Sequence, residues 1–351
     1  MSIWRMVRGT PHDSANAGLG NWFSKVASKA PLAIPLAESG AAGKLRPVQE
    51  MVQTPVKAKC WQERAETHRA ALAPVTSAFR QRRARGDLHP VHDFLFSYYS
   101  FPAGKLEQWH PAVGEVLTTA EDLPHHFSQK HYRHHNGTVA LNPDILRPKD
   151  LERFRFARQL LEVTASRPPN FGCHGLHEWA MVYQSDDIRH RERAPLRLSP
   201  QEIKEFVDSR TLACSHFDAV RFFTPAAAPR NRLQPTLLTR EEFEQPGCVH
   251  ANMDLYKWTF KAMPWLGSDL LRQTFFLALE LRELDMRASP YELSDYGYAA
   301  IPIETSGGRA QYEEIQQKLA NKAAALRVKV METLDVLFNQ VTISTHPNSI
   351  T

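Results

Sequence analysis

A stripe of apolar side chains near the C-terminus constrains the fold more than any other feature of this sequence. Between Arg309 and Phe338 apolar residues recur at helical spacing: Tyr312, Ile315, Leu319, Leu326, Val330, Leu334 and Leu337. This spacing places them on one face of an α-helix. Because such a helix gains most of its stability from covering its apolar face, we predict that it packs against a helical body.

Helical patterns also recur upstream. We predict helices over Gln62–Arg85, Val91–Phe101, Lys149–Ala165, Gly175–Gln184 and Ser268–Arg287. Two further helix starts are indicated at Ser199 and Ser289, where Ser, a following Pro and a Glu three positions later form the pattern of a capping box. The sequence has no Gly-rich phosphate loop and no alternation of strands with helices, which argues against a Rossmann or P-loop enzyme.

The stretches without a helical pattern indicate how the chain is divided into domains. Residues 112–147 lack a helical period and are dense in His and turn residues, which predicts a small β-hairpin or an ordered loop. Residues 1–58 are rich in Ala, Ser, Gly, Pro and Lys, so we predict a disordered extension, with an organelle-targeting segment as the alternative. The expected fold is therefore mainly α, with one helical, catalytic-like domain over 59–342 and a disordered tail over 343–351.

The net charge of the chain is concentrated at its N-terminus. The formal net charge is +5, and the first 60 residues, with eight basic and three acidic side chains, account for all of it. A nucleic-acid surface on the neutral body would depend on local clusters, because binding driven by counterion release needs local positive charge. The clusters are Arg80–Arg85, Arg153–Arg158 and Arg189–Arg193, and solvated helix faces are the alternative interpretation.

The cysteines and the apolar runs indicate the cellular compartment of the protein. The four cysteines are far apart and form no Cys-x-x-Cys pair: Cys60, Cys173, Cys214 and Cys248. That spacing argues against a zinc ribbon and a disulfide framework, so a reducing compartment is the simpler expectation. No run approaches the roughly 18 apolar residues of a membrane span, and no secretion-signal pattern opens the chain. We therefore expect a soluble, cytoplasmic protein with no membrane partner.

Candidate site residues are charged side chains that interrupt apolar, aromatic-rich helices. Burying a charge costs free energy, so a buried charged residue is expected to have either an ion-pair partner or a functional role. In Phe171–Tyr183, His177 and Glu178 fall in the first turn of the predicted helix. A structural His beside a cap-region Glu, which the helix dipole favours, is the alternative.

Two further segments follow the same pattern. Within Cys214–Phe223 the candidates are His216 and Asp218, with a plain Asp218–Arg221 ion pair as the alternative. Asp285 falls on the apolar side of its predicted helix, where an acid is either paired in the core or catalytic.

The sharpest pattern lies in Gln245–Trp258. A Pro-Gly turn opens a predicted helix on which His250, Asp254 and Lys257 share one face. A His–Asp pair at this spacing can orient an imidazole, help to hold a metal or set the pKa of an acid or base. An Asp254–Lys257 ion pair is the simpler alternative.

Six segments of the chain resemble an uncharacterised bacterial family whose automatic name is 3-methyladenine DNA glycosylase. The matching segments are His89–Ser100, Phe171–Tyr183, Cys214–Pro225, Glu244–Trp258, Leu284–Leu293 and Ile303–Tyr312. They fall within residues 61–338, so the N-terminal extension lies outside the resemblance. The resemblance implies a DNA-repair N-glycosylase that releases alkylated purine bases from DNA without a cofactor.

The mechanism of such an enzyme suggests roles for particular residues. A base-excision glycosylase stacks a flipped base on aromatic side chains and stabilises an oxocarbenium-like sugar with a carboxylate. Asp254, or secondarily Asp218, would then supply that carboxylate, with His250 and Lys257 as further catalytic candidates. The candidate substrate-binding residues are Trp179, Tyr183, Tyr256, Trp258 and Arg221.

Two other classes of function stay open. Helices that contribute His and carboxylate side chains to an interior site are typical of metal-dependent enzymes, such as non-haem iron oxidoreductases or hydrolases acting on a small molecule. The ligands of iron or another transition metal would come from His177, Glu178, His216, Asp218, His250 and Asp254. The third class is a non-catalytic small-molecule-binding protein whose polar helices only form buried ion pairs.

Overall fold

The computed structural model describes residues 54–186, 188 and 194–345. Most of the predicted N-terminal extension, the end of the predicted tail and the basic cluster Arg189–Arg193 lie outside these residues. The last part of the extension is described, and there Val56 pairs in parallel with Leu117. Two compact units are distinguished: the main unit comprises Thr54–Ile145 and Phe154–Thr351, and the other includes residues 146–153.

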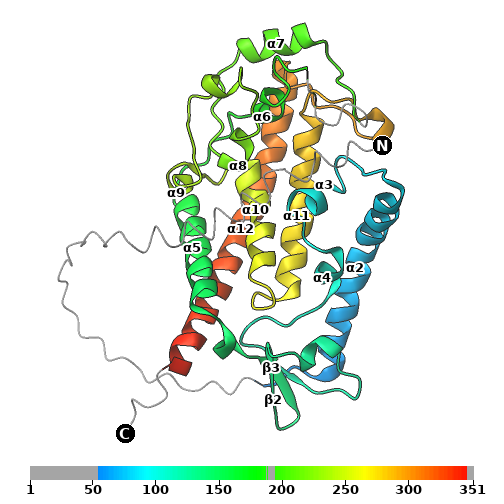
Figure 1. The fold of residues 1–351 in the computed structure, drawn as a ribbon, viewed down its shortest axis with the longest axis vertical. Helices are drawn as coiled ribbons and strands as arrows, with labels where there is room; N and C mark the ends of the chain where they lie inside the picture. The colour runs from blue at the N-terminus through cyan, green and yellow to red at the C-terminus, as the bar shows by residue number, and fades with distance from the viewer. Residues whose placement is uncertain (1–53, 187, 189–193, 346–351) are drawn as a thin grey trace, which may run out of the picture. The chain divides into compact units, whose positions relative to one another are not determined.

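Three helices form the core of the main unit. They are α10 (Val249–Lys261), α11 (Ser268–Arg287) and α12 (Ser306–Thr345), and they contact one another (Figure 1). The apolar stripe predicted near the C-terminus lies on α12 and is buried, apart from half-buried Ile315. The predicted mainly α fold is thus confirmed, and the packing of α12 against α10 and α11 supplies the cover that the stripe requires.

The predicted N-terminal helix is confirmed as α2 (Ala58–Arg85), which contacts α11. The next predicted helix, over Val91–Phe101, is shorter than expected and spans only Phe94–Tyr98 as α3. The ring of His89 explains its late start, because Nδ1 accepts hydrogen bonds from two backbone N–H groups at the beginning of the expected helix. A turn therefore replaces the first helical turn.

The predicted β-hairpin is confirmed and carries one additional strand. β2 (Tyr132–His135) and β3 (Thr138–Leu141) pair antiparallel, and β1 (Val116–Thr118) lies on the other side of β3. Asn136 and Gly137 join the hairpin with positive φ angles of 43° and 72°. This is the conformation that a two-residue hairpin turn of Asn-Gly favours.

Along the chain, the other helices lie before the sheet, as α4 does, or between the sheet and α10. They are α4 (Ala103–Glu107), α5 (Pro148–Ala165), α6 (Leu176–Ala180), α7 (Pro200–Asp208), α8 (Phe217–Val220) and α9 (Arg240–Phe243). The 3₁₀ turns are η3 (His125–Ser128), η4 (Pro143–Ile145), η5 (Ala228–Arg230) and η6 (Ser294–Tyr296). The prediction of α5 is confirmed, whereas α6 ends four residues before the predicted Gln184.

The predicted caps had mixed outcomes. The capping box at Ser199 is confirmed in full. The one at Ser289 is wrong, because its hydroxyl donates back to the carbonyl of Met286 and no α-helix follows. Ser268 opens α11 but does not cap it, since its hydroxyl accepts from the His110 N–H. Among the described helices, none is long and apolar enough to cross a membrane.

Candidate functional site

Charged residues from separate segments of the sequence meet inside the main unit. α6 contributes His177, the residue before α8 is His216, and α10 contributes His250. The ring centroids of His177 and His250 are 4.5 Å apart, and those of His250 and His216 are 5.4 Å apart. All three rings are buried. The histidines therefore form a row that joins two polar clusters, one at each end.

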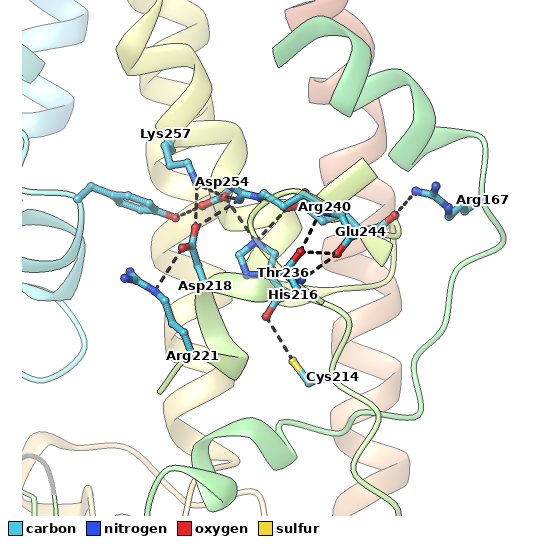
Figure 2. Close-up of polar contacts among 12 residues, drawn as sticks. Arg167, Cys214, His216, Asp218, Arg221, Thr236, Arg240, Glu244, Asp254 and Lys257 are labelled. Atoms are coloured by element: carbon cyan, nitrogen blue, oxygen red, sulfur yellow. Dashed lines mark hydrogen bonds and ion pairs between the residues drawn. The ribbon is translucent and has the colours of Figure 1, made fainter. Parts of the chain in front are cut away.

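The first cluster, here called the carboxylate–cation cluster, comprises Asp218, Arg240, Glu244, Asp254 and Lys257 (Figure 2). The Arg240 guanidinium lies 3.0 Å from Asp254, 3.3 Å from Asp218 and 2.8 Å from Glu244. The Lys257 ammonium pairs with Asp254 and lies 3.3 Å from Asp218. Every carboxylate of the cluster thus has a cationic partner, which confirms the predicted Asp254–Lys257 pairing.

Charge balances in this cluster without any bound ion. Arg221 lies 3.3 Å from Asp218, which confirms that predicted ion pair and gives three cations for three carboxylates. Burial raises the pKa of Asp254, but Lys257, His216 and Arg240 outweigh it and hold that pKa well below its ordinary value. The hydroxyl of Tyr99 also donates to Asp254 at 2.8 Å. Asp254 is therefore an ionised, fully neutralised carboxylate.

His216 stands out because neither ring nitrogen has a hydrogen-bond partner among the described residues, although the ring is buried. Its Nε2 lies 3.5 Å from Asp254 and 3.6 Å from Glu244, and ligand atoms of the three residues lie within 4.8 Å of one another. The oxygens involved are already paired with Arg240 and Lys257. A divalent ion added to this neutral cluster would leave two uncompensated charges in the interior, which is strongly unfavourable.

The second cluster, here called the thiol–histidine cluster, comprises Cys173, His177, Cys214 and Asp285. The Cys173 sulfur lies 3.7 Å from His177 Nδ1, and these two atoms and the Cys214 sulfur all lie within 4.8 Å of one another. On its other side, His177 Nε2 is 2.5 Å from an Asp285 oxygen. An acid, an imidazole and two thiols are therefore arranged in sequence from α11 towards the loop before α6.

Local backbone conformation brings the thiol and the imidazole together. His174 and Gly175 both have positive φ angles, 45° and 75°, and this left-handed turn leads from Cys173 into α6. A Cβ at Gly175 would lie 3.3 Å from the Ala288 side chain, so the turn packs closely at the end of α11. Glycine is the residue that allows both the φ angle and the close approach.

Asp285 is held in place by a second ion pair. Arg282, one turn earlier on α11, lies 3.3 Å from Asp285 and 2.7 Å from Glu178. Burial raises the pKa of Asp285, but His177, His250 and Arg282 outweigh it and hold that pKa well below its ordinary value. Asp285 is thus an ionised acceptor, and the hydrogen bond to it requires a proton on His177 Nε2.

The two thiols differ in their pKa. A hydrogen bond from Cys214 lowers the pKa of Cys173 well below the ordinary thiol value; burial opposes this, and a further bond to His177 lowers it again. For His177, burial lowers the pKa, but Asp285 and Cys173 outweigh it and hold that pKa well above its ordinary value. Both pKa directions favour a thiolate–imidazolium pair of Cys173 and His177 when no metal ion is bound.

A small cavity of about 20 Å³ borders the thiol–histidine cluster. It is lined by Asn170, Cys173, His177, Ala213, Cys214, Ser215, Gln245, Cys248, Val249, Tyr312 and Gln316. Three of the four cysteines thus face one space, although they are far apart in sequence. Burial raises the pKa of Cys248 to about 12, and its thiol is not part of the group within 4.8 Å.

The aromatic residues predicted to bind substrate lie elsewhere. Trp179 is buried and its indole N–H donates to the carbonyl of Ala288. Tyr183 donates to Asp208, and Tyr256 is buried. The Trp258 ring packs under cations, with the Lys257 ammonium 5.0 Å from its centroid. Their roles in substrate binding stay predictions.

Comparison with known proteins adds no name to this site. No protein-family model matches the chain, and no curated protein and no solved structure is significantly similar to it. The geometry of the two clusters and the cavity is therefore the basis for inferring a function.

Proposed function

We propose that this protein is a metal-dependent enzyme in which Cys173, Cys214 and His177 hold a divalent ion of the zinc type. One observation carries the proposal: two sulfurs and an imidazole nitrogen lie within 4.8 Å of one another beside a cavity. In a tetrahedral site with Zn–S near 2.3 Å and Zn–N near 2.0 Å, ligand atoms are about 3.5–3.8 Å apart. The 3.7 Å between Cys173 and His177 fits this spacing without rearrangement.

The surroundings of His177 support the same proposal. A metal-binding histidine commonly donates its other ring N–H to a carboxylate, which fixes the ring and raises the basicity of the ligand nitrogen. Asp285 accepts such a bond from Nε2 at 2.5 Å, and Arg282 holds Asp285. His177 Nδ1 thereby faces the thiols, where a metal would take the place of its proton.

Charge also favours the thiol–histidine cluster over the carboxylate–cation cluster. Two thiolates supply the two negative charges that balance a divalent ion, whereas the carboxylates around His216 are already neutralised by Arg240 and Lys257. Soft thiolate ligands also select zinc over magnesium or calcium. The proposal therefore keeps the metalloenzyme class that the sequence suggested and assigns the ligands mainly to cysteines.

The ligand count indicates the class of reaction. A zinc site with three protein ligands keeps a fourth position for water or substrate, and zinc lowers the pKa of its bound water to near 7. Cys248 lines the cavity, but its thiol is not part of the group within 4.8 Å, so Cys173, Cys214 and His177 would leave a fourth position to water or substrate. We therefore assign the protein to the metal-dependent hydrolases.

The test is elemental analysis of protein purified without an affinity tag. Wild type and Cys60→Ser are expected to carry about one zinc per chain, because the exposed Cys60 thiol lies outside the cluster. Cys173→Ser and Cys214→Ser are expected to lose most of it. Metal-free wild type, or equal zinc in all four proteins, would contradict the proposal.

A second candidate function is release of alkylated purine bases from DNA. It rests on the family resemblance and on one observation: Lys257, which pairs with the ionised Asp254, also lies 5.0 Å from the centroid of the Trp258 ring. The basic clusters give it little support, because Arg80 and Arg82 pair with Glu107 and Asp93. Base release from alkylated DNA by wild type and by Asp295→Asn, with none by Asp254→Asn, would favour it; no release by wild type would remove it.

A further inference from the structure

We propose that Cys173 and Cys214 form a peroxide-sensitive pair that closes to a reversible disulfide, with hydrogen peroxide as the oxidant. The inference deepens the proposed function, since it names the regulation of the same site. It rests on the proposed function only for the loss of the metal ion that the disulfide would cause. The disulfide itself follows from the placement of the cysteines.

The first step concerns the distance between the two sulfurs. The Sγ atoms of Cys173 and Cys214 lie within 4.8 Å of each other, although the residues come from different segments of the chain. A disulfide needs a sulfur–sulfur distance of about 2.05 Å, so the two atoms have to approach by less than about 3 Å. Both residues lie in loops, Cys173 before α6 and Cys214 before α8. No helix or strand therefore has to be broken for the sulfurs to meet.

The second step concerns which cysteines pair. Cys248 lines the same cavity, but its thiol is not part of the group within 4.8 Å. Cys60 is exposed on α2, away from the cavity. Cys214 is held in place because its N–H donates to the Asn231 side-chain oxygen at 2.8 Å, and the Asn231 nitrogen donates back to its carbonyl at 2.9 Å. The geometry therefore selects Cys173 as the partner of Cys214.

The third step concerns access to the sulfurs. Cys173 is half-buried, whereas Cys214 is buried. The cavity beside them has a volume of about 20 Å³, which is room for about one water molecule. Hydrogen peroxide exceeds water by a single oxygen atom, so it is the oxidant that fits best. Cys173 is then the sulfur that meets the peroxide, and the buried Cys214 is the neighbouring thiol that resolves the product.

The reaction has two displacements. The Cys173 sulfur attacks one peroxide oxygen, so that an S–O bond forms, the O–O bond breaks and hydroxide leaves. The Cys214 sulfur then attacks the Cys173 sulfur, so that the S–S bond forms, the S–O bond breaks and a second hydroxide leaves. Each sulfur is oxidised by one electron, and the peroxide takes both electrons. The hydroxides become water with the protons of the thiols or, when the thiolates bind a metal, with protons from solvent. A dithiol such as dithiothreitol reverses the disulfide by exchange.

The disulfide would also determine the state of the proposed metal site. Oxidation removes the two negative charges that balance a divalent ion, and it leaves His177 as the remaining ligand of the group. A single imidazole is far short of the three protein ligands of a catalytic zinc site. Zinc should therefore leave on oxidation and return on reduction, so the same two cysteines would hold the metal and sense peroxide.

The test treats reduced, full-length protein with hydrogen peroxide and maps its disulfides by mass spectrometry of unreduced tryptic peptides. Lys and Arg residues separate all four cysteines, so each cysteine lies on its own peptide. The expected product is a cross-link between the Cys173 and Cys214 peptides that dithiothreitol reverses. Cys248→Ser, which removes the third thiol at the cavity, should keep this cross-link. Cys214→Ser should lose it and leave a sulfenic acid on Cys173.

Two results would overturn the inference: wild type that forms no disulfide with peroxide, or a disulfide that joins Cys248 in place of Cys173 or Cys214. Both are read on the unchanged protein, so the test stays decisive even if Cys214→Ser does not fold. Zinc release is followed on the same samples with a chromogenic chelator, and most of the zinc should be lost as the disulfide forms. The expected disulfide in protein that holds no zinc, or that keeps its zinc, would contradict the proposed function alone. Zinc-loaded protein that forms no disulfide would contradict this inference alone.

Discussion

At the scale of single residues, the bond from His177 Nε2 to Asp285 is the contact that most directly serves the proposed metal site. We expect Asp285→Asn to weaken zinc binding by about 10- to 100-fold, because the neutral amide no longer fixes the ring or raises the basicity of Nδ1. Glu280→Gln, at an exposed position of α11, is the control. Zinc affinity is measured by competition with a chelator, and equal affinities in both variants would contradict the assigned role of Asp285.

Arg282 carries a prediction about stability. It pairs with both Glu178 and Asp285, and all three side chains are buried. Arg282→Met should lower the free energy of unfolding by about 3–5 kcal/mol, because it leaves buried carboxylates without their cation. Arg272→Met, on the partly exposed side of the same helix, should cost no more than about 1 kcal/mol. Urea unfolding of both variants measures the difference, and similar losses would count against the ion pair.

His110 carries a prediction about pH. Burial, together with the nearby His126, Lys105 and His131, lowers its pKa to about 3. The unfolded chain therefore binds a proton near pH 6.5, while the folded protein does not until about pH 3. The free energy of unfolding must then fall as the pH drops through this window, by up to about 2 kcal/mol between pH 7 and 5 for this group. In the His110→Gln variant, the free energy of unfolding measured with urea should fall by correspondingly less between pH 7 and 5. A decrease as large as that of wild type would contradict the prediction.

At the scale of elements, Gly247 determines how closely the loop before α6 approaches the start of α10. A Cβ there would lie 2.7 Å from the carbonyl oxygen of Asn170, which is backbone and cannot move away cheaply. Gly247→Ala should cost about 1–3 kcal/mol of stability and reduce zinc binding, since Asn170 leads into Cys173. Gly104→Ala, in open space on α4, should be neutral or slightly stabilising. The test is to measure thermal unfolding and zinc content of both variants. Equal stability and equal zinc content in the two variants would contradict the prediction.

Most elements were predictable from the sequence, because they depend on local periodicity. The stripe on α12, the capping box at Ser199 and the Asn-Gly hairpin turn are all local patterns, and all are confirmed. Ser289 has the same local pattern as Ser199 but opens no helix. Its segment pairs instead through Tyr291 with Leu196, a contact between distant residues that a local motif does not encode.

At the scale of the whole molecule, the sequence predicted one cluster better than the other. His250, Asp254 and Lys257 share a helix face, so spacing alone placed them together in the carboxylate–cation cluster. Arg240 and Glu244, which neutralise that cluster, were missed because α9 is short and polar. The thiol–histidine cluster was missed because Cys173 and Cys214 come from different loops, and only the tertiary fold unites them. The one available signal was local, a Cys and a His four positions apart at Cys173 and His177.

The central claim is that sulfur ligands from Cys173 and Cys214 join His177 at a metal ion. X-ray absorption at the zinc edge, on full-length protein purified without a tag, tests it most directly because it reports the ligand atoms themselves. The predicted result is two sulfur ligands near 2.3 Å together with a nitrogen ligand near 2.0 Å. A shell of only nitrogen and oxygen ligands, or protein without bound zinc, would contradict the claim.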